Sequence, residues 1–539
     1  MAFRAISAVC SKYYVIIDIT NPFRYHLCIQ TETNWINVMA NLQIMDSGLQ
    51  PAEQAGVFSN EQIIEQIGVM ADQALFQGKM DILDDAAKLA ARVDTRVLSQ
   101  HQLAIFHYHV SNVWGNSFKL LPDDRKQERI WEQPEIEKQL IHNRLAVSAL
   151  EASDGESQLP VVCAIYTNLA NTLFQIGRFV EALEYWDRAL VLMPDFGMAV
   201  ANKGYALLHY AHLLHDEGHA MIYLLQSREI LRQALKLAID PHLRPFFKDH
   251  LKSLNRVLYP YNGKKFLTPA RDCSENDDGE TAFRNWRLQN RLCLNPINDL
   301  GSFMEAASDV IMTQPLEKDP AKAAWLQDHF TLLKQEFICA RQLYFEAMQS
   351  IPDHDAASCG AISPVTENAT CDLSVEKLKI AFRMAYSLFD KIAFFLKKYF
   401  QLPVSQQRVN FRTLWYPEGR KANGLQPKLL QSANWPLRGL FWLSKDLYEH
   451  NPDFKEGLEA DARQLYALRN HLEHNYLQIQ DDAPHAASGK SGFRVTDDAS
   501  VYVIGRTDFS NRTLRILKMV RAALIYLSLA VHWESSQIP

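Results

Sequence analysis

Three side chains toward the C-terminal end of the sequence have the types and spacing needed for acid–base chemistry at a phosphate. Arg469, Asn470 and His474 lie within the segment LYALRNHLEHNYLQI. A histidine titrates near neutral pH and can accept or donate a proton, whereas an arginine stays charged and can bind a phosphate through two parallel hydrogen bonds. These residues are therefore candidates for catalysis on a phosphodiester.

The spacing decides which of these side chains can act together on a helix. Asn470 and His474 are four residues apart and share one helix face. Five residues place Arg469 about 140° from His474 around the axis, so the long arginine side chain must curl back. The apolar face of the predicted helix consists of residues that recur at a helical period, namely Leu465, Leu468, Leu472 and Tyr476.

Other long helical segments must position this motif. Segments 377–400 and 512–533 are rich in apolar and aromatic residues at helical spacing. Helices of this length with such faces predict a four- or five-helix bundle over 373–539. The β-favouring sequence VYVIGRTDF at 501–509 predicts a small hairpin or an extended connection between the last two helices.

Charge is unevenly distributed along the chain, whose net charge is −6. Residues from 373 onward contain 23 Lys and Arg against 16 Asp and Glu, whereas the first 372 contain 33 against 46. A basic C-terminal part is expected to bind a polyanion such as RNA, although the two parts could instead neutralise each other across an interface. The candidate RNA-binding residues are Lys397, Lys398, Arg438, Arg512 and Arg515.

The N-terminal half contains a repeat. Residues 166–194 place small side chains at Ala170, Ala182 and Ala189, where two antiparallel helices would touch, with Gly177 at the turn. This pattern resembles the 34-residue tetratricopeptide (TPR) repeat. Because one helix pair cannot bury its apolar face alone, we expect a TPR-like solenoid over 58–258. The resemblance implies a concave groove that binds a protein or peptide partner.

The C-terminal motif also resembles a known family. The R-x-x-x-x-H spacing, with a polar residue after the arginine, is similar to the signature of HEPN domains. The segments DKIAFFLKKYF, LRGLFWLSKDL at 437–447 and WRLQNRLCLNPINDL at 286–300 resemble the TPR-coupled bacterial HEPN class. This resemblance covers about 280–535.

The HEPN resemblance implies a metal-independent endoribonuclease without a cofactor. It assigns the catalytic roles to Arg469, Asn470 and His474, with the site completed across a homodimer. RNA would be cleaved by its own 2′-hydroxyl, leaving 2′,3′-cyclic phosphate and 5′-hydroxyl ends. Such proteins commonly serve in antiviral defence or stress responses.

Simpler roles remain open for several of these residues. Arg469 could pair with Glu473 on a solvated face, leaving His474 as a surface residue, or His471 and His474 could bind a metal. Asp390 could orient a catalytic group or pair with Arg383 or Lys397. Tyr476 completes the pattern R-x-x-x-x-H-x-Y, which resembles the motif of related toxins that are silenced when a nucleotide is attached to the tyrosine. Its place on the apolar helix face instead predicts core packing.

A histidine cluster, HYAHLLHDEGH, suggests a second chemistry. His215 and His219 are four apart, a spacing that resembles the zinc-binding H-E-x-x-H motif. Gly218 inside the would-be helix and Asp216 in place of the glutamate argue against this interpretation. We therefore expect His209, His212, His215 and His219 to be surface residues near a helix end.

Composition sets the broad class of the protein. The chain has 539 residues, 47% of them hydrophobic, with only 21 Gly and 22 Pro, so we predict an all-α protein. Eight cysteines without a C-x-x-C pair predict a reducing, cytoplasmic environment. The N-terminus makes a poor signal peptide, and the apolar run 522–533 is too short to span a bilayer, so we expect no membrane association.

These observations predict four regions and two alternative functions. The regions are an unassigned extension (1–57), TPR-like repeats (58–258), a helical connector with polar loops (259–372) and a HEPN bundle (373–539). The first function is a HEPN endoribonuclease regulated through its TPR sensor. The second is a non-catalytic adaptor that binds a protein through the TPR groove and RNA or a nucleotide through the bundle.

Overall fold

The described part of the computed structural model runs from Ser59 to Gln537, apart from residues 129, 154–157, 262–265, 273–277, 314–319, 350–372, 406–408, 431, 449–457, 459–461, 481–493 and 496–500. The predicted extension 1–57 and the polar tract 351–372 therefore lie outside the described residues. The chain divides between Phe266 and Leu267 into two units. Each unit is considered by itself.

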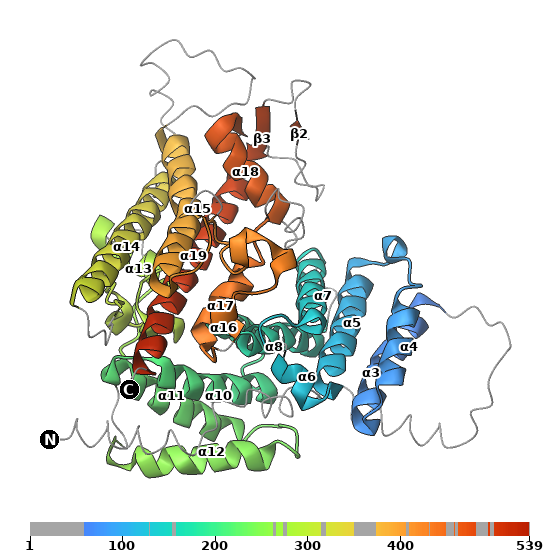
Figure 1. Ribbon diagram of the computed structural model, residues 1–539. Helices are drawn as coiled ribbons and strands as arrows, with labels where there is room; N and C mark the ends of the chain where they lie inside the picture. Colours follow the sequence, from blue (N-terminus) through green and yellow to red (C-terminus); the bar gives the residue numbers. More distant parts are fainter. Residues whose placement is uncertain are drawn as a thin grey trace, which may run out of the picture. The chain divides into compact units, whose positions relative to one another are not determined.

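The first unit is a series of helices, coloured blue to green in Figure 1. In chain order they are α3 (Asn60–Gln77), α4 (Met80–Ala90), α5 (Gln100–Leu120), α6 (Asp123–Glu128), α7 (Pro134–Glu151), α8 (Leu159–Gln175), α9 (Phe179–Leu192), α10 (Gly197–Leu213), α11 (Glu217–Ala234) and α12 (Arg244–Val257). Helices α3 and α4, α5 and α7, α8 and α9, and α10 and α11 pack as pairs. The paired packing confirms the predicted helical-repeat architecture.

The sequence of the pair α8–α9 explains its close packing. Ala170, Ala182 and Ala189 are completely buried, as expected for small side chains where two helices touch. The turn between the helices uses Gly177 at φ 89°, a conformation that residues with a side chain rarely adopt. The Arg178 amide closes this turn by donating to the carbonyl of Leu173 (2.8 Å).

Buried asparagines link the first helices of successive pairs. Nδ2 of Asn168 on α8 donates to Oδ1 of Asn112 on α5 (2.9 Å), and Nδ2 of Asn202 on α10 donates to Oδ1 of Asn171 on α8 (3.1 Å). Each of these amides is more than 90% buried. Because a buried amide without a partner is unfavourable, these bonds favour one relative position of the stacked pairs.

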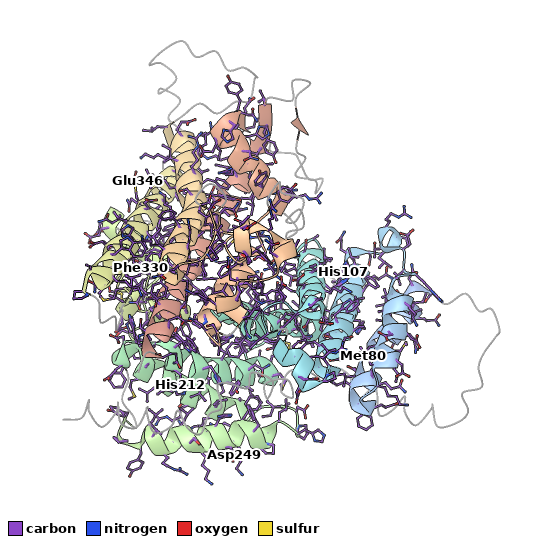
Figure 2. The ribbon with its side chains drawn as sticks, in the orientation of Figure 1. Met80, His107, His212, Asp249, Phe330 and Glu346 are labelled. Atoms are coloured by element: carbon purple, nitrogen blue, oxygen red, sulfur yellow. The ribbon has the colours of Figure 1, made fainter. Side chains whose placement is uncertain are left out.

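A histidine pair joins α5 to α7 in the same interior. Nδ1 of His107, labelled in Figure 2, lies 3.0 Å from Nδ1 of His142. One ring must donate while the other accepts, so the contact excludes simultaneous protonation of these two nitrogens. Burial lowers the pKa of both His107 and His142 to about 4, and the neighbouring charges of His142 and Lys138, respectively, act in the same direction.

His215 and His219 do not share a helix face. Helix α10 ends at Leu213, and Asp216 caps the N-terminus of α11 by accepting from the His219 amide (2.7 Å). His209 is not a surface residue either, since it is buried beside Phe174 and Tyr205, and burial lowers its pKa.

The second unit contains the helices α13 (Gly279–Gln289), α14 (Pro320–Gln349), α15 (Leu373–Phe400), α16 (Pro427–Leu430), α17 (Trp435–Ser444), α18 (Ala462–His474) and α19 (Arg506–Ser536). Helix α19 packs against α14, α15 and α17, and α14 packs along α15 (Figure 1). Every residue from Val520 to Val531 of α19 is buried, so this helix is the centre of the bundle. In the described residues, no helix is long and apolar enough to cross a membrane.

A three-stranded sheet stands beside the bundle, and the prediction of only a hairpin or extended connection was incomplete. The strands are β1 (Tyr476–Gln480), β2 (Arg494–Val495) and β3 (Val501–Gly505), in the order β1-β3-β2. Strand β3 pairs antiparallel with β2 and parallel with β1. Because β1 follows α18 directly, the sheet is built onto the end of that helix.

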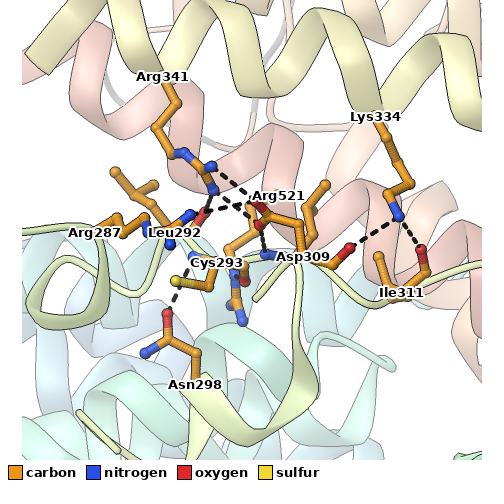
Figure 3. A network of polar contacts seen from close by, with 10 residues as sticks. Arg287, Leu292, Cys293, Asn298, Asp309, Ile311, Lys334, Arg341 and Arg521 are labelled. Atoms are coloured by element: carbon orange, nitrogen blue, oxygen red, sulfur yellow. Dashed lines mark hydrogen bonds and ion pairs between the residues drawn. The ribbon is translucent and has the colours of Figure 1, made fainter. Parts of the chain in front are cut away.

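The segment before α14 is part of this unit and not a separate connector. Arg341 on α14 forms an ion pair with Asp309 (2.8 Å) and donates to the Leu292 carbonyl (2.6 Å) (Figure 3). Arg521 on α19 donates to the Cys293 carbonyl (2.7 Å) and forms an ion pair with Asp299. These buried cations attach residues 292–309 to the bundle. The predicted division between a connector at 259–372 and a bundle at 373–539 therefore differs from the division at 266/267 that the structure shows.

Candidate functional site

Helix α18 carries the candidate motif on a half-buried face. Leu465, Leu468 and Leu472 are buried, as their helical spacing predicts, and fix the rotation of the helix against the bundle. The helix ends at His474, so Tyr476 belongs to strand β1. Tyr476 is 71% exposed, and the prediction that it packs in the core is wrong because the chain leaves the helical path two residues earlier.

Arg469 and Asn470 are in direct contact. Nη1 of Arg469 donates to Oδ1 of Asn470 (3.1 Å), and both residues are half-buried. The arginine side chain is thus folded toward a residue that shares a helix face with His474. This is the direction in which Arg469 must turn if it is to act with the histidine.

Asp390 on α15 is the acidic neighbour of this arginine. Its Oδ1 accepts from the backbone amide of Phe411 (3.3 Å). Burial raises the pKa of Asp390, whereas the Phe411 amide and the positive charge of Arg469 act in the opposite direction. The carboxyl group therefore lies within electrostatic reach of Arg469.

Arg383, one of the alternative partners considered for Asp390, instead holds the end of α18. Its Nη2 donates to the carbonyl oxygen of Leu472, and its Nε lies 3.8 Å from Oε1 of Glu473. A cation at the last carbonyls of a helix compensates their unpaired hydrogen-bonding capacity and the negative end of the helix dipole. Glu473 accordingly pairs with Arg383 here, and not with Arg469 as the simpler alternative supposed.

The two histidines of the motif have different surroundings. His474, at the end of the helix, is exposed. His471 is half-buried, its ring lies 5.0 Å from that of Tyr502 on β3, and its Nδ1 is buried without a hydrogen-bond partner. His474 is therefore the histidine that a large substrate can reach. Among the described residues, no group of three or more His, Cys, Asp and Glu could hold a metal ion.

The predicted RNA-binding residues are divided by the structure. Arg438 is buried within α17, and Arg512 forms an ion pair with Asp508 (2.8 Å), with its side chain only 11% exposed. Because both side chains are largely buried, the prediction that they bind RNA at the surface is wrong. Arg515 and Lys397 are half-buried, and Lys398 is exposed. The structure does not support a single RNA-binding face formed by all five residues.

Sequence reasoning missed Arg383 as part of this region except as a possible partner of Asp390. A signal for it existed in the spacing of α15, where Arg383 and Asp390 are seven residues apart and thus lie on the same side of the helix. Arg383 donates to the Leu472 carbonyl at the end of α18, and the charge of Arg469 on α18 acts to lower the pKa of Asp390, so both residues lie on the side of α15 toward α18. Seven-residue spacing between charges is common, however, and does not by itself identify a site.

Comparison with known families agrees with this architecture. A family model described as LA2681-like HEPN matches residues 319–534, and a tetratricopeptide repeat model matches residues 163–196. The chain thus combines TPR-type repeats with a HEPN domain. Its HEPN domain is of the LA2681-like kind and includes α14, α15, α18, the sheet and most of α19. No curated protein and no solved structure matches the chain.

Proposed function

We propose that this protein is a metal-independent endoribonuclease in which the HEPN domain cleaves RNA by attack of a 2′-hydroxyl on the adjacent phosphate. The observation that carries the proposal is the arrangement of α18, which turns Arg469 toward Asn470 within electrostatic reach of the half-buried Asp390 and leaves His474 exposed. The LA2681-like HEPN match supports it, because HEPN domains are often ribonucleases.

The residues suit the charge changes of this reaction. The 2′-oxygen forms a bond to phosphorus while the bond from phosphorus to the 5′-oxygen breaks. The 2′-hydroxyl proton passes to a base, and the 5′-oxygen receives a proton from an acid. His474 can take one of these roles, and Arg469 stabilises the additional negative charge on the phosphate.

A second copy of the chain completes the proposed site. One protomer offers one exposed histidine in the motif, whereas the reaction needs both a base and an acid. Two copies of α18 meeting in a homodimer would supply two histidines to one RNA. The TPR unit would bind a protein or peptide partner and thereby regulate the nuclease, in antiviral defence or a stress response.

The first experiment is incubation of the full-length protein with total cellular RNA in the presence of EDTA. Wild type is compared with His474→Ala and with His242→Ala, a matched variant at another exposed histidine. We expect wild type and His242→Ala to leave 2′,3′-cyclic phosphate and 5′-hydroxyl ends, and His474→Ala to leave none. RNA binding without new ends in all three proteins would favour the non-catalytic adaptor.

A further inference from the structure

The small sheet beside α18 has two different faces. Along β1, Leu477 and Ile479 are buried, whereas Tyr476 is exposed and the two residues that alternate with the buried ones are half-buried. On the adjacent β3, Tyr502 and Ile504 are buried in the same alternation. Because successive side chains of a strand point to opposite faces, the inner face packs on the domain and Tyr476 begins the outer face.

Tyr476 is held close to His474. Because Tyr476 is only two positions after His474 in the chain, their Cα atoms are at most about 7 Å apart. The backbone of Tyr476 is fixed on one side by the end of α18 and on the other by parallel pairing with Val501 of β3. Tyr476 thus lies at a defined place beside the exposed histidine.

The exposure of this ring is unusual for the domain. At 71%, Tyr476 is the most exposed large apolar or aromatic side chain in the described part of the second unit. Exposed aromatic rings on sheets commonly stack on unpaired bases of single-stranded RNA, a contact that a base inside a duplex cannot make. The sequence from 373 onward has more basic than acidic residues, which favours a polyanionic ligand for this part of the chain as a whole.

We propose that Tyr476 is a base-stacking residue that selects single-stranded RNA, and that it binds a base next to the phosphate approached by His474. This inference rests on the proposed function, because it assigns the substrate class to the same site. It also gives the exposed ring a role that the core-packing prediction did not. The relevant property is the aromatic face and not the phenolic hydroxyl.

The test measures RNA binding separately from cleavage. Full-length protein carrying His474→Ala is titrated with a single-stranded oligoadenylate of roughly a dozen nucleotides and with an abasic ribose–phosphate oligomer of equal length. Adding Tyr476→Ala is expected to weaken binding of the oligoadenylate about 10-fold and to leave binding of the abasic oligomer unchanged. Tyr476→Phe retains the aromatic face and is expected to bind like the parent. The matched control is Tyr259→Ala, at a tyrosine that is 74% exposed in the first unit.

Each other outcome would overturn the inference. Equal weakening for both oligomers would show that bases are not recognised, and equal weakening together with loss of a dimer in sedimentation would assign Tyr476 to a protein interface. Weaker binding of the oligoadenylate by Tyr476→Phe would implicate the phenolic hydroxyl. Unchanged binding by Tyr476→Ala, or a parent protein that binds neither oligomer, would exclude a stacking role. Because the readout is base-dependent binding, it is independent of whether wild type cleaves RNA.

Discussion

Asp390 on α15 lies within electrostatic reach of Arg469 on α18, and the arginine in turn donates a hydrogen bond to Asn470. A half-buried carboxyl that favours one position of a flexible guanidinium restricts where that permanent positive charge can lie. In the proposed nuclease this restriction matters, because Arg469 must turn around the helix to act at the same phosphate as His474. We therefore predict that Asp390 positions Arg469.

Replacement Asp390→Asn tests this relationship. The amide keeps the shape and can still accept from the Phe411 amide, but it removes the negative charge beside Arg469. We expect RNA cleavage to fall on the order of 10- to 100-fold, with little change in overall RNA binding. Single-turnover cleavage and binding titrations with the same RNA measure the two effects.

The pH profile adds a signature specific to Asp390. Burial raises the pKa of this carboxyl, so as pH falls it is protonated earlier than an ordinary aspartate and loses its attraction for Arg469. Wild-type activity should therefore decline on the acid side in part through Asp390, and that part should be missing in Asp390→Asn. A variant with wild-type activity at every pH would contradict the positioning role.

The Arg383 contact with the end of α18 predicts a second effect on activity. Arg383→Met removes the donor to the Leu472 carbonyl and the pair with Glu473, so the last turn that carries His474 should fray. We expect about a 10-fold loss of cleavage, with a change of less than about 1 kcal/mol in the free energy of unfolding because the side chain is 44% exposed. Cleavage rates and urea titrations measure these quantities.

Lys391→Met is the matched control for Arg383. Lys391 lies on the same helix, is 47% exposed and forms an ion pair with Glu336. It is expected to retain wild-type cleavage. An equal loss of activity in both variants would attribute the effect to the charge of α15 and not to the end of α18.

Periodic features of the sequence were predicted well for physical reasons. The alanines of α8–α9 and the leucines of α18 report local helix geometry, which depends on residues a few positions apart. The candidate motif could be found in the same way, because Arg469, Asn470 and His474 belong to one helix. The apolar period of that helix extends to Tyr476, whereas the helix itself ends at His474, and this difference reverses the predicted environment of Tyr476.

Long-range polar contacts could not be predicted from one sequence. Asp309 and Arg341 meet although they are 32 residues apart, and Arg521 reaches Cys293 across 228 residues. The sequence identifies such residues only as charged, and charged side chains are expected at the surface. For the same reason it predicts a surface role for Arg438 and Arg512. Which guanidinium group is buried depends on the packing of helices that are distant in the sequence, and the local sequence pattern does not determine it.

The buried network in Figure 3 predicts a strong effect on stability. Arg341 is 1% exposed and bonds both Asp309 and the Leu292 carbonyl. Removing one partner of a buried pair leaves the other charge uncompensated, so Arg341→Met should lower the free energy of unfolding of the second unit by about 3–5 kcal/mol. The measurement is a urea titration monitored by tryptophan fluorescence.

Lys377→Met, at a more exposed ion pair, is the control for Arg341→Met, and a double variant of Arg341 and Asp309 tests their coupling. Lys377 pairs with Glu346 at a more exposed position, with side chains 26% and 39% exposed, so its loss should change stability by less than about 1 kcal/mol. Combining Arg341→Met with Asp309→Leu should be less destabilising than the sum of the two single changes. Additive effects would argue against direct coupling between Arg341 and Asp309.

The histidine pair of the first unit predicts a loss of stability in mild acid. Folding lowers the pKa of His107 and His142 from 6.5 to about 4, so between these values the unfolded chain binds more protons than the folded chain. The contribution of these rings to the free energy of unfolding is fully present above about pH 6.5, declines as pH falls, and levels off below about pH 4. Each ring accounts for up to about 3 kcal/mol of this loss. Replacing both rings, as in His107→Gln with His142→Gln, should flatten the dependence of the thermal midpoint on pH in this range. A midpoint that falls equally steeply in the double variant would assign the acid sensitivity to other groups, such as His109, whose pKa burial also lowers to about 4.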